Sequence, residues 1–146
     1  MYNRILHATD LSENHFHMCQ QAVDLAKRFE AQLYLLHAIE TPTSLQIAQG
    51  LGFAEIDNPS QLKEDAQAVL AVLGESFKIP ADHLFVEVGS IKQHVFTSLK
   101  NLDCNLLIIG RHMHHYIPAY LESSAHAINQ EANCDVLTLN WNNLIK

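Results

Sequence analysis

The clearest indication of the fold class is a continuous apolar run ending in a glycine, Leu106-Leu107-Ile108-Ile109-Gly110. Apolar residues in succession, without alternation, are typical of a strand covered by helices on both faces of a parallel sheet. Just upstream, Gly89-Ser90-Ile91-Lys92-Gln93 carries the S-x-x-Q capping box that begins a helix. The spacing therefore predicts a helix followed by a buried strand, the repeating unit of an α/β domain.

The rest of the chain repeats this alternation. Further strands are predicted at Asn3 to Ala8, Gln32 to Ile39, Leu84 to Val88, and Asp135 to Leu139 or beyond. Helices are predicted after the turn and capping residues Thr9-Asp10-Leu11-Ser12, after Asn58-Pro59-Ser60-Gln61, and from Ser123 or Ser124. The second of these helices should bury a stripe made of Leu62, Ala66, Val69, Leu70, Leu73 and Phe77.

These elements predict one domain over residues 1–146 with a doubly wound, Rossmann-like α/β fold. We expect a five-stranded parallel sheet with helices on both faces. Asn3 to Ala8 should be central, flanked by the strands at 32–39 and 106–109. The connection over residues 41–57 has no clear pattern.

Composition excludes several classes of partner. The 146 residues are 48% apolar, and 9 Lys and Arg against 16 Asp and Glu give a net charge of −7. This acidic balance disfavours nucleic acid and anionic membranes as partners, and no apolar run approaches the roughly 20 residues of a membrane span. The N-terminus lacks a signal-peptide layout, and three cysteines without a C-x-x-C motif predict neither disulfides nor a zinc ribbon. We therefore expect a cytoplasmic protein.

Ligands of such sheets bind beyond the carboxyl ends of the strands, which here means residues 8–12, 38–42 and 110–124. The first of these loops contains no glycine, which excludes a G-x-G-x-x-G cradle, and the chain contains no P-loop and no G-x-S-x-G elbow. Asp10 stands alone after the first strand, without the clustered acids of a receiver domain. The residues therefore predict no catalytic site.

The loop after the fourth predicted strand carries a resemblance. The chain resembles the universal stress protein family, whose members close their ligand site with G-x2-G-x9-G-[ST] at this point and carry an Asp after the first strand. Gly110 matches the first glycine and Ser124 the final Ser/Thr, whereas Met113 and Ser123 stand at the other two glycine positions. Asp10 matches the Asp of the first strand, and Leu36-His37-Ala38 is similar to the segment that contacts adenine.

The two departures imply a subclass. In members that bind ATP, the glycines let backbone N–H groups approach the phosphates. With Met113 and Ser123 present instead, the chain is more similar to the universal stress protein A subgroup, which keeps Ser-Ser-Ala at this helix start and is thought not to bind ATP. The resemblance implies a dimeric, non-enzymatic stress-response or regulatory protein without a cofactor.

Two other function classes stay open. The chain could be a sensor of ATP, AMP or another adenine compound, with Asp10, Ala38, Gly110 and Ser124 as contacts. An enzyme of the wider adenine-nucleotide α-hydrolase-like group is the third class, but the phosphate loop or H-x-G-H pattern expected of it does not occur.

Several of these residues also have ordinary structural interpretations. Asp10 could hold a ribose hydroxyl, but Asp is also a routine turn and capping residue. Ser123 and Ser124 could meet an anion, yet Ser is a favoured N-cap in any case. The cluster His112, His114 and His115 lacks further ligands at a recognised spacing, so we expect no metal site there. His7 and His37, on inner strands, should be partly buried and hydrogen-bonded.

The last predicted strand indicates a homodimer. Val136 to Trp141 has no proline, lysine or glycine to protect a sheet edge, and alternation places Leu137, Leu139 and Trp141 on one face. Pairing with a second copy about a two-fold axis would cover Leu139 and Trp141. The family resemblance implies the same dimer.

Overall fold

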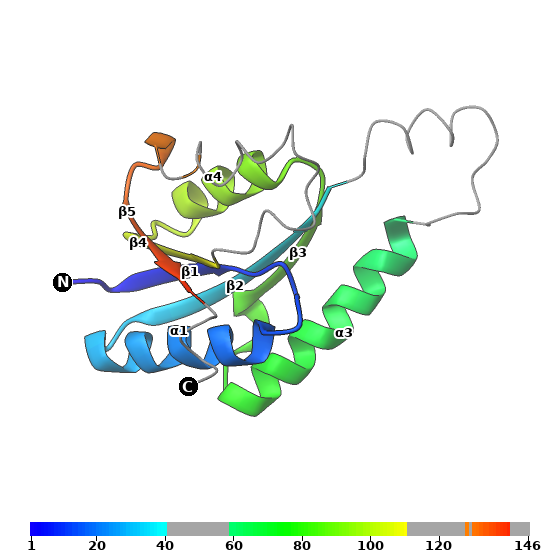
Figure 1. The fold of residues 1–146 in the computed structure, drawn as a ribbon, viewed down its shortest axis with the longest axis horizontal. Helices are drawn as coiled ribbons and strands as arrows, with labels where there is room; N and C mark the ends of the chain where they lie inside the picture. The colour runs from blue at the N-terminus through cyan, green and yellow to red at the C-terminus, as the bar shows by residue number, and fades with distance from the viewer. Residues whose placement is uncertain (41–58, 111–127, 129, 141–146) are drawn as a thin grey trace.

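The computed structural model describes residues 1–40, 59–110, 128 and 130–140. These residues contain one five-stranded parallel sheet with the order β3-β2-β1-β4-β5 (Figure 1). The strands are β1 Arg4–Ala8, β2 Gln32–Ile39, β3 Leu84–Val88, β4 Leu106–Gly110 and β5 Asp135–Leu139. The predicted fold class is confirmed, with β1 central between β2 and β4.

Helices cover both faces of the sheet. They are α1 His15–Phe29, α3 Pro59–Phe77 and α4 Ile91–Asn101, with a short 3-10 helix, η1, at Ala81–His83. Figure 1 shows α1 and α3 on one side and α4 on the other, and two separate apolar cores lie between these layers. The helix predicted from Ser123 or Ser124 starts outside the described residues, although Ile128, Gln130 and Glu131 are helical. No helix in the described part of the chain is long and apolar enough to cross a membrane.

The stripe predicted for α3 is partly wrong. Leu70 and Leu73 are buried, but Leu62 is 37% exposed and Val69 is 36% exposed. The buried face of α3 runs through Ala66, Leu70, Leu73 and Gly74, and a Cβ at Gly74 would lie 2.8 Å from Leu84 Cδ1 of β3. Leu62 and Val69 lie at the flank of this face, where their side chains are only partly covered.

The start of α1 also differs from the prediction. Capping was expected among residues 9–12, whereas α1 begins at His15 after the N-cap Asn14, whose side chain makes no capping hydrogen bond. The polar side chains of Thr9 and Asp10 bond within their own turn instead. These two side chains therefore stabilise the turn after β1 and do not cap α1.

Candidate functional site

The candidate site lies where β1, β2 and β4 end, and its first part is the turn at residues 9–12. Thr9 Oγ1 accepts a hydrogen bond of 3.1 Å from the Leu11 N–H, and Asp10 Oδ1 accepts one of 2.9 Å from the Ser12 N–H. Leu11 has a φ of 55°, a left-handed conformation that is unusual for leucine. Two backbone donors that could face an anion at this edge are therefore already bonded within the turn.

The second part of the site is Gly110, the last residue of β4. A Cβ at this position would lie 2.7 Å from the Met18 Sδ and 3.1 Å from the Met18 Cε. Met18 belongs to the first turns of α1 and is buried. Packing of α1 therefore accounts for the glycine here without any ligand.

Two histidines near this edge are hydrogen-bonded to the backbone, one to the turn and one to β4. His37 on β2 donates through Nδ1 to the Thr9 carbonyl oxygen at 2.8 Å, and His7 on β1 donates through Nδ1 to the Ile108 carbonyl oxygen at 3.1 Å. Burial lowers the pKa of both histidines, and the nearby Asp10 carboxylate partly opposes this effect. Both are therefore held in the neutral form near pH 7, as hydrogen-bonded supports of the edge. His37 is half-buried as expected, but His7 is fully buried rather than partly.

The structure brings together only some of the residues predicted for the site. Asp10 and Gly110 follow or end adjacent parallel strands at the same edge. The Ala38 side chain packs with the core on the α4 side, whereas a Cβ at Gly110 would face Met18 on the α1 side. Met113, Ser123 and Ser124 lie outside the described residues, as does the cluster His112, His114 and His115. Within the described residues, no group of three or more His, Cys, Asp or Glu could hold a metal ion.

Comparison with known proteins identifies the family. The profile of the universal stress protein family matches residues 1–140. The chain belongs to the universal stress protein family. It is 34% identical over 139 residues to universal stress protein A homolog 2 of Coxiella burnetii, an alignment that covers 94% of each chain.

Solved structures agree with this family fold. The hypothetical protein MJ0577 superposes with a TM-score of 0.73 at 17% identity, covering 96% of both chains. A universal stress protein crystallised in complex with cAMP superposes with a TM-score of 0.67 at 17% identity, covering 95% of this chain and 97% of the other. At such identities these likenesses support the Rossmann-like fold alone.

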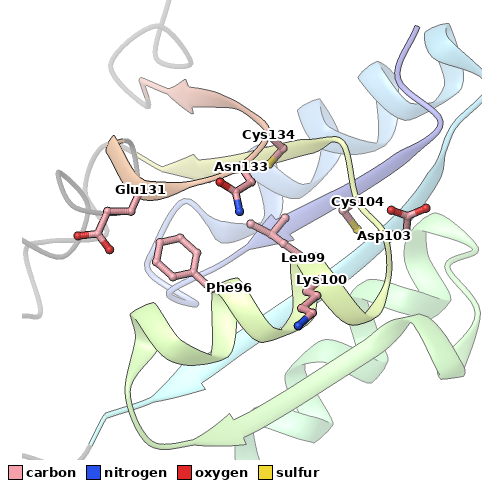
Figure 2. Close-up of a pocket in the computed structure, with 8 residues that line it drawn as sticks. All are labelled: Phe96, Leu99, Lys100, Asp103, Cys104, Glu131, Asn133 and Cys134. Atoms are coloured by element: carbon pink, nitrogen blue, oxygen red, sulfur yellow. The ribbon is translucent and has the colours of Figure 1, made fainter.

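This universal stress protein chain also has a cavity of about 480 Å³ near the amino ends of β4 and β5, away from the site described above. It lies between α4 and the segment that enters β5, and Figure 2 shows Leu99 and Asn133 extending toward one another across it. At one end, Glu131 pairs with Lys92 of α4 at 2.7 Å. Sequence analysis missed this cavity, although Cys104 and Cys134 precede neighbouring parallel strands and could have been placed together on that ground.

The two thiols of this cavity are poor nucleophiles. Burial raises the pKa of Cys104 to about 12 and also raises the pKa of Cys134, which keeps both protonated near pH 7. Cys19, in the core under α1, likewise has its pKa raised by burial to about 12.

Proposed function

We propose that this universal stress protein is a cytoplasmic, homodimeric stress-response or regulatory protein that does not bind ATP tightly and has no catalytic activity. The observation that carries the proposal is the occupied edge of the sheet. Met18 fills the space beside Gly110, and the turn after β1 uses its own side chains to bond the Leu11 and Ser12 N–H groups. Free cysteine thiols in the described residues also fit a reducing compartment.

The argument against tight ATP binding concerns backbone access. A phosphate needs unbonded N–H groups that it can approach closely, and glycine permits that approach. The two N–H groups of the 9–12 turn are already satisfied. Two of the three glycine positions of the family motif carry Met113 and Ser123. Few donors at this edge therefore remain for a triphosphate within the described residues.

Isothermal titration calorimetry with ATP and Mg²⁺ tests the proposal on the full chain. We expect no micromolar binding by the natural sequence, and an increase in affinity for the double variant Met113→Gly/Ser123→Gly. The matched control is Val69→Gly/Ser76→Gly on α3, which introduces two glycines far from this edge and should not bind more tightly. Micromolar ATP binding by the natural sequence would contradict the proposal.

A second candidate function is a sensor of an adenine nucleotide. It is favoured by the related universal stress protein whose structure contains cAMP, and by Asp10 at the end of the central strand. A thermal-shift panel with ATP, AMP and cAMP separates the candidates, since a ligand at 100 times its dissociation constant adds about 2.7 kcal/mol of stability. Stabilisation that disappears in Asp10→Ala would favour the sensor.

The dimer is proposed through β5, an edge strand paired only with β4 in the described sheet. Leu137 is 36% exposed there, whereas Leu139 is only 9% exposed because it already packs into the core on the α1 side. A partner copy would therefore cover little further surface of Leu139. Trp141 lies outside the described residues, and Leu137 becomes the best probe of the interface.

Sedimentation equilibrium tests this dimer. We expect a mass of two chains at micromolar concentration, and one chain for Leu137→Glu, because the variant would bring two like charges together at the axis. Val72→Glu on α3 is the control, since Val72 is 60% exposed and lies on a different surface. A single-chain mass for the natural sequence would refute the dimer. Dissociation by Val72→Glu, and not by Leu137→Glu, would show that the interface lies on α3.

The absence of a metal cofactor is also part of the proposal. Metal sites that hold a fold together make its stability sensitive to chelators. We expect the melting temperature at pH 7.5 to be unchanged by EDTA. A decrease on adding EDTA would contradict this and would make His112, His114 and His115 the first residues to mutate.

A further inference from the structure

His7 is an unusual residue for the centre of a sheet. It lies on β1, the middle strand, with only 1% of its surface exposed. Its Nδ1 bonds the Ile108 carbonyl oxygen at 3.1 Å, while its Nε2 is the one buried side-chain nitrogen or oxygen in the described residues without a hydrogen-bond partner. Because a carbonyl only accepts, Nδ1 carries the hydrogen and Nε2 carries a lone pair. The closed core therefore fits the neutral ring and provides no acceptor for a second N–H.

His37 can be compared directly with His7, because it lies on the neighbouring strand and bonds the turn at residues 9–12. It lies on β2, shares the α1 side of the sheet with His7, and donates through Nδ1 to the Thr9 carbonyl oxygen. His37 is half-buried, and its Nε2 is not among the buried atoms that lack a partner. A proton gained at His37 can therefore be hydrated, whereas a proton gained at His7 cannot.

Within the described residues, the elements on the same side of the sheet as His7 carry few titratable side chains. The 9–12 turn has Asp10, β2 has His37, and the first turns of α1 have His15 and Cys19. β4 contributes only apolar side chains and Gly110. The Asp10 carboxylate favours a charged His7, but burial outweighs it and lowers the pKa of His7. No anion among these groups is hydrogen-bonded to Nε2.

We propose that His7 is a proton sensor beneath the ligand edge of the sheet: a proton taken up at Nε2 opens the packing between β1 and α1 and loosens the turn at residues 9–12. The buried cation must reach water or an acceptor. The route to solvent leads past α1, because β2 and β4 occupy both sides of β1 within the sheet. Opening on that side also separates Met18 from Gly110 and frees the edge of the sheet.

The direction of the pH dependence follows from the buried neutral ring. The unfolded chain binds a proton at His7 near the ordinary histidine pKa of about 6.5, and the folded chain binds it only at lower pH. Stability due to the neutral ring is therefore complete above about pH 6.5 and is lost as the pH falls below it.

Urea unfolding between pH 7.5 and 5.5 tests the linkage with natural protein, His7→Phe, His7→Gln and the control His37→Gln. A histidine that is protonated only in the unfolded chain raises the equilibrium constant of unfolding about tenfold at one pH unit below its pKa in that chain. We expect this tenfold increase to be missing from His7→Phe relative to the natural sequence. His37→Gln should retain it, because that variant removes only the separate contribution of the lowered His37 pKa. Equal pH dependence in natural protein and His7→Phe would overturn the proposal.

Labelling of Cys19 with a dipyridyl disulfide tests where the opening occurs. Cys19 lies on α1 and is 1% exposed. A thiol loses reactivity in acid, so the labelling rate of Cys19 is divided by its labelling rate in the unfolded chain at the same pH. Mass spectrometry verifies that Cys19 is the labelled residue. We expect this ratio to rise at least fivefold from pH 7.5 to 5.5 in the natural protein, and to stay constant in a folded His7 variant. A constant ratio in the natural protein would refute the opening at α1.

If neither His7 variant folds, NMR of labelled histidines in the natural protein decides the matter. The His7 ring should keep its neutral Nδ1–H tautomer at pH 5.5 in the folded chain. Titration of His7 in the intact folded chain near pH 6.5, without loss of amide protection at Leu11 and Ser12, would overturn the proposal.

Discussion

β4 and β5 are adjacent strands of equal length and pair in parallel, yet they are covered very differently. Every residue of β4 is buried, whereas in β5 only Leu139 is buried. Ile108 and Leu137 are direct partners in register, and they are 0% and 36% exposed respectively. β4 has a strand on each side and apolar cores on both faces, whereas β5 has one neighbouring strand in the part of the sheet that the structure describes. An apolar sequence therefore predicts a strand without specifying how completely it is covered.

The sharpest test of this difference replaces the paired residues by alanine. We expect Ile108→Ala to lower the free energy of unfolding by about 2–5 kcal/mol, since it leaves a cavity in closed packing. Leu137→Ala should cost less than about 1 kcal/mol per chain, because a partly exposed side chain loses less burial. Urea denaturation at a concentration that keeps the chain monomeric measures both. Similar losses for the two variants would show that β5 is as well covered as β4.

The order of the elements could be predicted because its signals are local. Continuous apolar runs such as 106–109 predicted the strands and capping residues predicted the helix starts. The doubly wound class placed Asn3 to Ala8 at the centre of the sheet, where β1 is observed. The orientation of α3 could not be predicted, since it depends on the contact between Gly74 and Leu84, two residues from different elements. Periodicity alone does not show which glycine permits such an approach.

The candidate site was less predictable from sequence than the fold. Gly110 and Asp10 were placed at the correct edge, but the sequence could not show that Met18 lies against that glycine. The unpartnered Nε2 of His7 is also a property of the assembled core. Whether a buried polar atom finds a partner depends on neighbours from several strands and helices, and sequence spacing does not specify them.

The end of β4 offers a smaller test of the same contrast. Gly110 pairs with Leu139, the point where β5 too becomes buried. We expect Gly110→Ala to cost about 1–2 kcal/mol, since its Cβ overlaps Met18 and the flexible methionine must move. In a Met18→Ala background the same change should cost almost nothing, and a double-mutant cycle by urea denaturation measures the coupling. An equal cost in both backgrounds would mean that Met18 is not the obstacle.

The smallest expected effect concerns the segment that leads into β5, which an exposed ion pair holds to α4. Lys92 Nζ lies 2.7 Å from Glu131 Oε2, and the two side chains are 38% and 55% exposed. Water and salt screen such a pair, so Glu131→Gln should cost no more than about 0.5 kcal/mol at low salt. The cost should vanish near 1 M NaCl, where the screening length is only about 3 Å. Glu75→Gln is the control, since Glu75 is exposed on α3. If Glu131→Gln alone lowered the free energy of unfolding by more than about 1 kcal/mol, the ion pair would contribute more than an exposed pair should. The segment before β5 would then be as firmly attached as the buried strand β4, which would contradict the contrast between them.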